Sequence, residues 1–72
     1  MQTVKIHTEY IELHKLLKLS GVCGSGGEAK EAVTSGQVKV DGEPENRKGK
    51  KIRPGQKVEF QNTVLLVEAG PK

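Results

Sequence analysis

The sequence predicts an α+β domain in which two short helices pack on a small, mostly antiparallel sheet. Residues 8–19 and 25–35 repeat apolar side chains at helical spacing. Residues 37–40, 57–60 and 63–68 alternate apolar and polar side chains, with turn residues between them. Because the helices precede strands that are joined by short turns, the strands are expected to pair antiparallel. The 72 residues suffice for one domain, and we expect residues 1–72 to form it.

The first half opens with a strand and a helix. Thr3–Ile6 alternates apolar and polar residues, as an edge strand does. Thr8 is the expected N-cap of a helix that continues to about Leu19, and Gly21 ends that helix. Its spacing places Tyr10, Leu13, Leu16 and Leu17 on an apolar face, and His14, Lys15 and Lys18 on the opposite face.

A second helix begins after a glycine-rich linker. Ser25 and Glu28 have the spacing of a capping box, in which the serine side chain accepts a hydrogen bond from the glutamate amide. We expect the helix to continue to about Ser35 and to end at Gly36. Its narrow apolar stripe consists of Ala29, Ala32 and Val33.

The second half reads as strands and turns. Val38 and Val40 point inward from a strand over residues 37–40, and Asp41-Gly42 predicts a two-residue hairpin turn. Pro44 limits the next segment to an irregular or edge strand. Residues 47–51 are too polar for the core and read as a loop or an exposed ribbon. Arg53-Pro54-Gly55-Gln56 fits a type II turn before strands at residues 57–60 and 63–68, which join at Gln61-Asn62.

Positive charge is concentrated in one segment. The net charge is +3 and the pI is about 9.2, but six of the twelve Lys and Arg residues lie between positions 47 and 57, without one acidic residue. Such a segment is typical of a surface that contacts a polyanion. The alternative to polyanion binding is that this segment is a solvated face that aids solubility. A membrane surface fits poorly, because Gly49, Pro54 and Gly55 interrupt any basic amphipathic helix.

The sequence gives little support for dinucleotide binding, metal binding or catalysis. Gly24–Ala29 formally fits the dinucleotide pattern G-x-G-x-x-A, but no strand precedes it, so a helix entry is the better interpretation. His7 and His14 lack further ligands, so no metal site is expected. Cys23 has no neighbouring base and reads as a buried filler. We expect no catalytic residues and no cofactor.

The cysteine count and the hydropathy suggest where the protein works. Cys23 is the only cysteine, which excludes an intramolecular disulfide and favours a reducing compartment. No signal-like run and no segment of transmembrane length are apparent. We therefore expect a cytoplasmic protein with no membrane partner.

The order of these elements resembles the αL RNA-binding motif, the domain named after small-subunit ribosomal protein S-four. The matching segments are residues 13–21, Ser25 with Ala29, residues 36–42 and residues 53–58. The sequence is most similar to the small stand-alone bacterial members, the YbcJ-type proteins, which also carry a Leu-Leu-Lys-Leu helix and a basic hairpin return. The resemblance covers nearly the whole chain.

The resemblance implies RNA binding, often to ribosomal RNA or tRNA. Carried over to this chain, the family surface comprises Lys15, Lys18, Ser25, Lys30, Gln37, Lys39 and Gly42. Three residues depart from common family types: Gly26 replaces Arg, Asp41 replaces Asn and Glu12 replaces a basic residue. From these departures we infer a contact surface shifted toward Arg47, Lys48, Lys50 and Lys51.

The sequence therefore predicts a non-catalytic RNA-binding protein that recognises structured RNA by shape and backbone contacts, because stacking platforms are scarce. Ribosomal RNA or tRNA is the expected partner, the ribosome a possible one, and a monomer the expected state. The alternative is an adaptor whose basic patch meets an acidic protein. The RNA hypothesis requires the lysines and arginines to converge on one surface without interleaved carboxylates.

Overall fold

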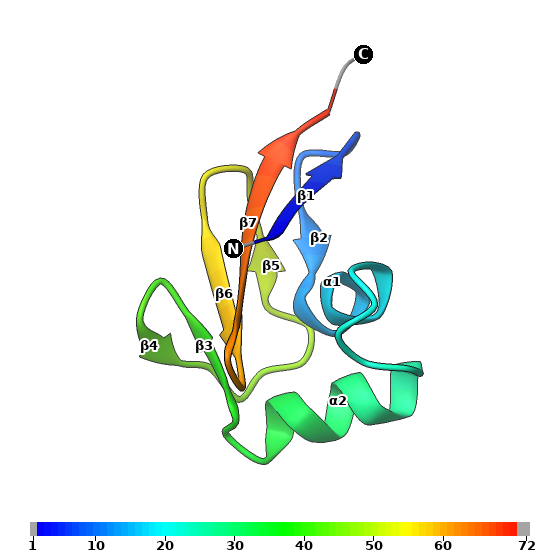
Figure 1. Ribbon diagram of the computed structural model, residues 1–72, viewed down its shortest axis with the longest axis vertical. Coiled ribbons are helices and arrows are strands. Elements are labelled where there is room, and N and C mark those ends of the chain that lie inside the picture. Colours follow the sequence, from blue (N-terminus) through cyan, green and yellow to red (C-terminus); the bar gives the residue numbers. More distant parts are fainter. Residues whose placement is uncertain (1, 71–72) are drawn as a thin grey trace.

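The computed structural model describes residues 2–70, and its elements follow the predicted order closely (Figure 1). Two helices lie in the first half of the chain, and short strands make up most of the rest. The elements are β1 (Gln2–Ile6), β2 (Ile11–Glu12), α1 (Leu13–Leu19), α2 (Gly26–Thr34), β3 (Val38–Val40), β4 (Glu43–Pro44), β5 (Lys51–Ile52), β6 (Lys57–Phe60) and β7 (Thr63–Ala69).

The strands form a five-stranded sheet and a separate two-stranded ribbon. The sheet has the order β1-β7-β6-β3-β4, in which only β1 and β7 are parallel. The ribbon pairs β2 with β5 antiparallel. The expected α+β class and the mostly antiparallel sheet are therefore confirmed, and β1 is an edge strand as predicted.

The predicted turns are present in the structure. Asp41 and Gly42 both have positive φ angles, 52° and 87°, and connect the paired residues Val40 and Glu43. This is the backbone of the mirror-image turns that match the twist of a hairpin. At Pro54-Gly55, Gly55 has a φ of 97° and the Gln56 amide donates to the Arg53 carbonyl at 3.1 Å, in agreement with a type II turn.

One core connects the helices with the sheet and the ribbon. Leu13, Leu16 and Leu17 of α1 are completely buried. Figure 1 shows α2 across the lower end of the molecule, with α1 beside it. The sheet contributes alternate residues because successive side chains point to opposite faces. The buried residues beyond α1 are Val4, Ile6, Cys23, Ala29, Ala32, Val33, Val38, Val40, Ile52, Val58, Phe60, Leu65 and Val67.

The start of the first helix was predicted wrongly. Thr8 is not its N-cap, because the Thr8 hydroxyl donates to the Tyr10 carbonyl at 2.7 Å. The N-cap is Glu12, whose side chain makes no capping hydrogen bond. Ile11 and Glu12 pair with β5 instead, and this pairing holds the segment extended. Tyr10 consequently lies outside the core with 37% of its surface exposed.

The second helix agrees with its prediction except in one detail. The Glu28 amide donates to the Ser25 hydroxyl at 3.2 Å, as a capping box requires. The Glu28 carboxylate, however, accepts from the Gly24 amide at 2.8 Å rather than from that of Ser25. The helix ends at Thr34, one residue before the predicted end. In residues 2–70, no helix is long and apolar enough to cross a membrane.

Candidate nucleic-acid interface

The most basic part of the molecule is held by main-chain hydrogen bonds against the start of α1. We define the cationic loop as residues 47–51. The amide of Leu13 donates to the Lys50 carbonyl at 2.9 Å, and the amide of His14 donates to the Lys48 carbonyl at 3.1 Å. The first amides of a helix have no partner within it, so the loop carbonyls serve as the cap that Glu12 does not provide. The path of the cationic loop is therefore fixed by α1.

The ribbon of β2 and β5 fixes the other end of the cationic loop. Ile52 of β5 is completely buried and pairs with Ile11 of β2. Its neighbour Lys51 points outward and pairs in register with Glu12. Alternation along β5 thus buries the isoleucine as an anchor and leaves the lysine exposed.

The cationic loop borders a shallow hollow of about 420 Å³, lined by Arg47, Gly49, Lys50 and Lys51. Lys48 and Lys51 are exposed, whereas Lys50 is half-buried. Among the ion pairs between residues 2–70, none involves Lys48, Lys50 or Lys51. These three ammonium groups can therefore meet an external anion without first breaking an ion pair. Lys50, however, also lines a hollow with Asp41, Glu43 and Glu45, and its charge contributes to lowering the pKa of Asp41 and of Glu45.

Carboxylates neutralise part of the surrounding charge. The Arg47 Nε lies 3.2 Å from the Glu45 Oε2, and this contact lowers the pKa of Glu45 and raises that of Arg47. The Lys15 Nζ lies 3.0 Å from the Glu12 Oε1, and its hydrogen bond lowers the pKa of Glu12. Carboxylates thus lie beside Lys15 and Arg47. These two residues therefore contribute less positive charge to the surface than the sequence predicted.

Asp41 lies at the border of the same region. Its carboxylate accepts from the Lys57 amide at 3.0 Å and from the Gln56 side chain at 3.0 Å. The hydrogen bond from the Lys57 amide is the main reason that the pKa of Asp41 is lowered, and the charge of Lys50 contributes. Asp41 therefore faces the cationic loop as an anion.

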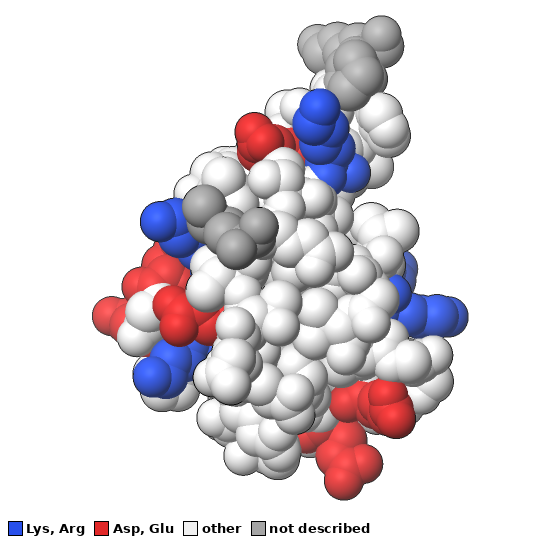
Figure 2. Space-filling model, in the orientation of Figure 1, with Lys and Arg blue, Asp and Glu red and all other residues white. Residues whose placement is uncertain are grey.

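The other predicted contact residues are spread over several elements. Lys18 is in the last turn of α1, Lys30 is exposed on α2, and Gly42 is in the turn between β3 and β4. Lys39 of β3 pairs in register with Glu59 of β6. Figure 2 shows one face on which Lys and Arg lie around the margin with Asp and Glu between them. On that face, therefore, the convergence without interleaved carboxylates that the RNA hypothesis required is not met. The hypothesis now depends on Lys48, Lys50 and Lys51 rather than on all the predicted lysines and arginines.

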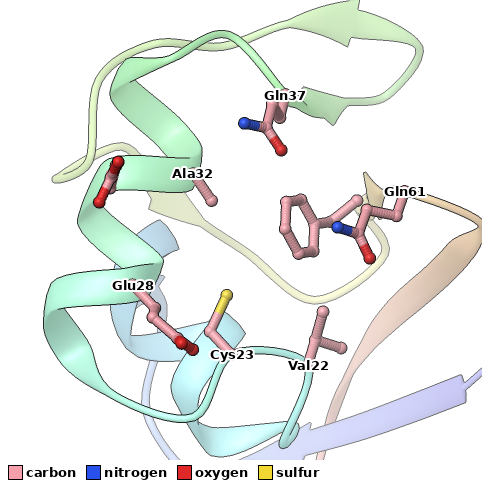
Figure 3. Close-up of a pocket in the computed structure, with 8 residues that line it drawn as sticks. Val22, Cys23, Glu28, Ala32, Gln37 and Gln61 are labelled. Atoms are coloured by element: carbon pink, nitrogen blue, oxygen red, sulfur yellow. The ribbon is translucent and has the colours of Figure 1, made fainter.

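Two predicted residues, Ser25 and Gln37, lie near a hollow that carries negative charge. It has a volume of about 290 Å³ and includes Glu28 and Glu31 (Figure 3). Ser25 caps α2 beside it, and the Gln37 side chain donates to the Ser35 hydroxyl at 2.9 Å. Gln37 lines the hollow as well, and the other lining residues are Val22, Cys23, Ala32, Phe60 and Gln61.

Cys23 is a buried filler, as the sequence predicted. Only 4% of its surface is exposed, and it belongs to the core. Burial is the main reason that the pKa of its thiol is raised, and the charge of Glu28 adds to the effect. Within residues 2–70, no group of three or more His, Cys, Asp or Glu side chains could hold a metal ion.

The exposed position of Tyr10 beside the cationic loop was not predicted from the sequence. The Lys51 Nζ lies 4.9 Å from the centre of the Tyr10 ring, which brings the single tyrosine of the chain to the edge of the cationic loop. The signal was the short alternation Tyr10-Ile11-Glu12, which fits a strand as well as a helix start. Read as a strand, it directs Ile11 inward and Tyr10 outward.

Comparison with known proteins identifies relatives over most of the chain. A protein of Escherichia coli (strain K12), named "Putative RNA-binding protein YbcJ", is 55% identical over 60 residues, covering 83% of this chain and 86% of the relative. A protein of Bacillus subtilis (strain 168), named "Probable ribosome maturation protein RlbA", is 43% identical over 58 residues, covering 81% of this chain and 82% of the relative.

A solved structure and a family model agree with these relatives. The solution structure of YbcJ from E. coli, described as revealing an αL motif involved in RNA binding, superposes with a TM-score of 0.67 at 46% identity. It covers 94% of this chain and 85% of the YbcJ chain. The S4 domain model matches residues 4–68. The chain therefore belongs to the S4 domain family and has the αL fold that the sequence resemblance predicted.

Proposed function

We propose that this protein is a single RNA-binding domain that recognises structured RNA, without catalysis, through the cationic loop and the start of α1. The observation that carries the proposal is the pair of main-chain bonds from Leu13 and His14 to the loop. They hold the backbone of three lysines without ion pairs on a rigid base, so little backbone freedom is lost when phosphates bind. The names of the E. coli and B. subtilis relatives support RNA as the partner.

The chemistry of this surface favours backbone contacts over base sequence. Lysine ammonium groups bind phosphates as point charges, and A-form RNA hides its base edges in a deep, narrow groove. We further propose ribosomal RNA as the target, because one relative is named for ribosome maturation. We also propose that the protein acts as a monomer in the cytoplasm, a reducing compartment that the single cysteine favours. Transfer RNA is the second RNA class, and both carry helical phosphate arrays of the same spacing.

Two charge-matched triple variants test the proposal. The first changes Lys48, Lys50 and Lys51 to Glu, and the second changes the three exposed lysines Lys18, Lys30 and Lys39 to Glu. Affinities for a folded ribosomal RNA fragment are measured by fluorescence anisotropy at low salt, with circular dichroism as a check of folding. We expect the parent to bind, the first variant to lose binding, and the second to keep most of it.

Each other outcome has a definite meaning. Failure of the parent to bind RNA would overturn the proposed function and leave an acidic protein as the partner class. Loss of binding in the second variant only would place the contact surface at the positions that the family resemblance implies. In that case the cationic loop would be excluded, although RNA binding itself would stand.

A further inference from the structure

An exposed aromatic ring stands at the edge of the cationic loop. Of residues 2–70, only Tyr10 and Leu19 are large apolar side chains with substantial exposure, at 37% and 61%. Tyr10 is held in place from both sides in the chain. Its carbonyl accepts from the Thr8 hydroxyl, and the next residue, Ile11, is paired with β5. The backbone that carries the ring therefore has a fixed position, although the surface of the ring is not used by the core.

The Tyr10 ring lies next to a cation and also borders an open hollow. The Lys51 ammonium group is 4.9 Å from the ring centre, a distance at which a cation is attracted to the aromatic face. Tyr10 also lines a hollow of about 360 Å³ together with Thr8, Ile11, Glu12 and Lys15. That volume is at the lower end of the range for small-molecule sites, roughly 300–1,000 Å³.

These observations point to a specific ligand group. A planar, exposed ring on a fixed backbone offers a stacking surface to another flat group. In an RNA such a group is an unpaired base, because paired bases are covered by their neighbours. The Lys51 ammonium group lies over the ring and can meet a phosphate next to that base, whereas Lys15 lines the same hollow with its ammonium group paired to Glu12.

We infer that Tyr10 is a stacking subsite for one unpaired base of the bound RNA. The inference rests on the proposed function and adds to it a preference for RNA in which a helix is interrupted by a loop or bulge. The lysines hold the phosphates of the helix and Tyr10 takes the displaced base. The protein then recognises the RNA by its shape and backbone and, at Tyr10, also by the presence of one unpaired base.

The test compares two RNAs and three variants. One RNA is a hairpin with an unpaired loop, and the other is a duplex of the same length without unpaired bases. Stacking on one aromatic ring corresponds to roughly 5- to 150-fold in affinity. Tyr10→Ala is expected to weaken hairpin binding at least fivefold, within that range, and to leave duplex binding unchanged. Tyr10→Phe should retain hairpin binding, and Leu19→Ala should affect neither RNA.

Tyrosine fluorescence gives a second, direct measurement. Tyr10 is the only tyrosine and the chain contains no tryptophan, so the emission reports on this ring alone. The hairpin is expected to quench it and polyphosphate to leave it unchanged, after correction for absorbance with free tyrosine. Equal weakening of both RNAs by Tyr10→Ala, or no weakening of either, would overturn the subsite. The proposed function would still stand in those cases, since it fails only if the parent binds neither RNA.

Discussion

Asp41 shows what a single side chain contributes to this fold. Its backbone is left-handed, with a φ of 52°, and lies in the turn between β3 and β4. Asp and Asn are favoured in this backbone conformation. Its carboxylate then binds the Lys57 amide and the Gln56 side chain, and so fastens the turn to the start of β6. The turn was predictable from Asp-Gly alone, whereas bonds across fifteen and sixteen residues were not.

Replacing Asp41 by Asn should therefore lower stability in a pH-dependent way. Asn keeps the turn, but its amide group faces the Gln56 donor, so about 0.5–1.5 kcal/mol is expected to be lost at pH 6. The folded-state pKa of Asp41 is below its ordinary value of 3.8, so its stabilisation is present above that pH and disappears as the pH falls through the folded pKa.

Urea unfolding of the parent and of Asp41→Asn between pH 2 and 7 measures this effect. The difference in unfolding free energy should shrink below about pH 4, because protonation removes the charge from the parent. Glu43→Gln, in the neighbouring exposed strand, removes one charge without touching the turn bonds and serves as the control. A difference for Asp41→Asn that persists unchanged to pH 2 would show that its charge contributes nothing.

At the scale of elements, the ribbon of β2 and β5 determines where the cationic loop lies. Each of its strands has only two residues, too few for a periodic pattern, which is why residues 11–12 were assigned to a helix. The longer elements, α2 and β7, end within one residue of their predicted ends because their patterns extend over several side chains. The long, regular segments were thus predictable from the sequence. The ribbon was not, because it forms only through the pairing of β2 with β5 in the folded chain.

The two isoleucines of the ribbon are expected to differ in importance. Ile52 is fully buried, so Ile52→Val should cost about 0.5–1.5 kcal/mol of unfolding free energy through the small cavity it leaves. Ile11 is only partly buried, and Ile11→Val should cost clearly less. Equilibrium urea unfolding with an unchanged m-value provides the measurement. Equal costs at the two positions would contradict the role of Ile52 as the anchor.

At the scale of the whole molecule, the charge is less one-sided than the sequence alone indicated. Residues 47–51 stay together because they are contiguous, so this part of the surface was predictable. The distribution of the other lysines, and the approach of Glu12 to Lys15 and Glu45 to Arg47, depend on chain folding. Spacing in the sequence contains no information on which carboxylate faces which cation.

The salt dependence of RNA binding should reflect this distribution. Each neutralised phosphate contributes roughly −0.7 to −0.9 to the slope of log affinity against log salt. Lys48→Gln is expected to reduce the magnitude of the slope by about that amount, because it removes one proposed phosphate contact of the cationic loop. Lys5→Gln, in β1 and paired in register with Glu68, should leave the slope unchanged. Equal slopes for Lys48→Gln and the parent would exclude Lys48 as a phosphate contact.

The attachment of residues 47–51 to α1 has a consequence for how this surface can evolve. The anchoring atoms are carbonyl oxygens and amides, which every substitution other than proline preserves. The side chains at positions 48 and 50 can therefore be replaced by mutation while the path of the backbone stays the same. Selection can thus change the charge presented at these positions one residue at a time, without rebuilding the interior of the domain.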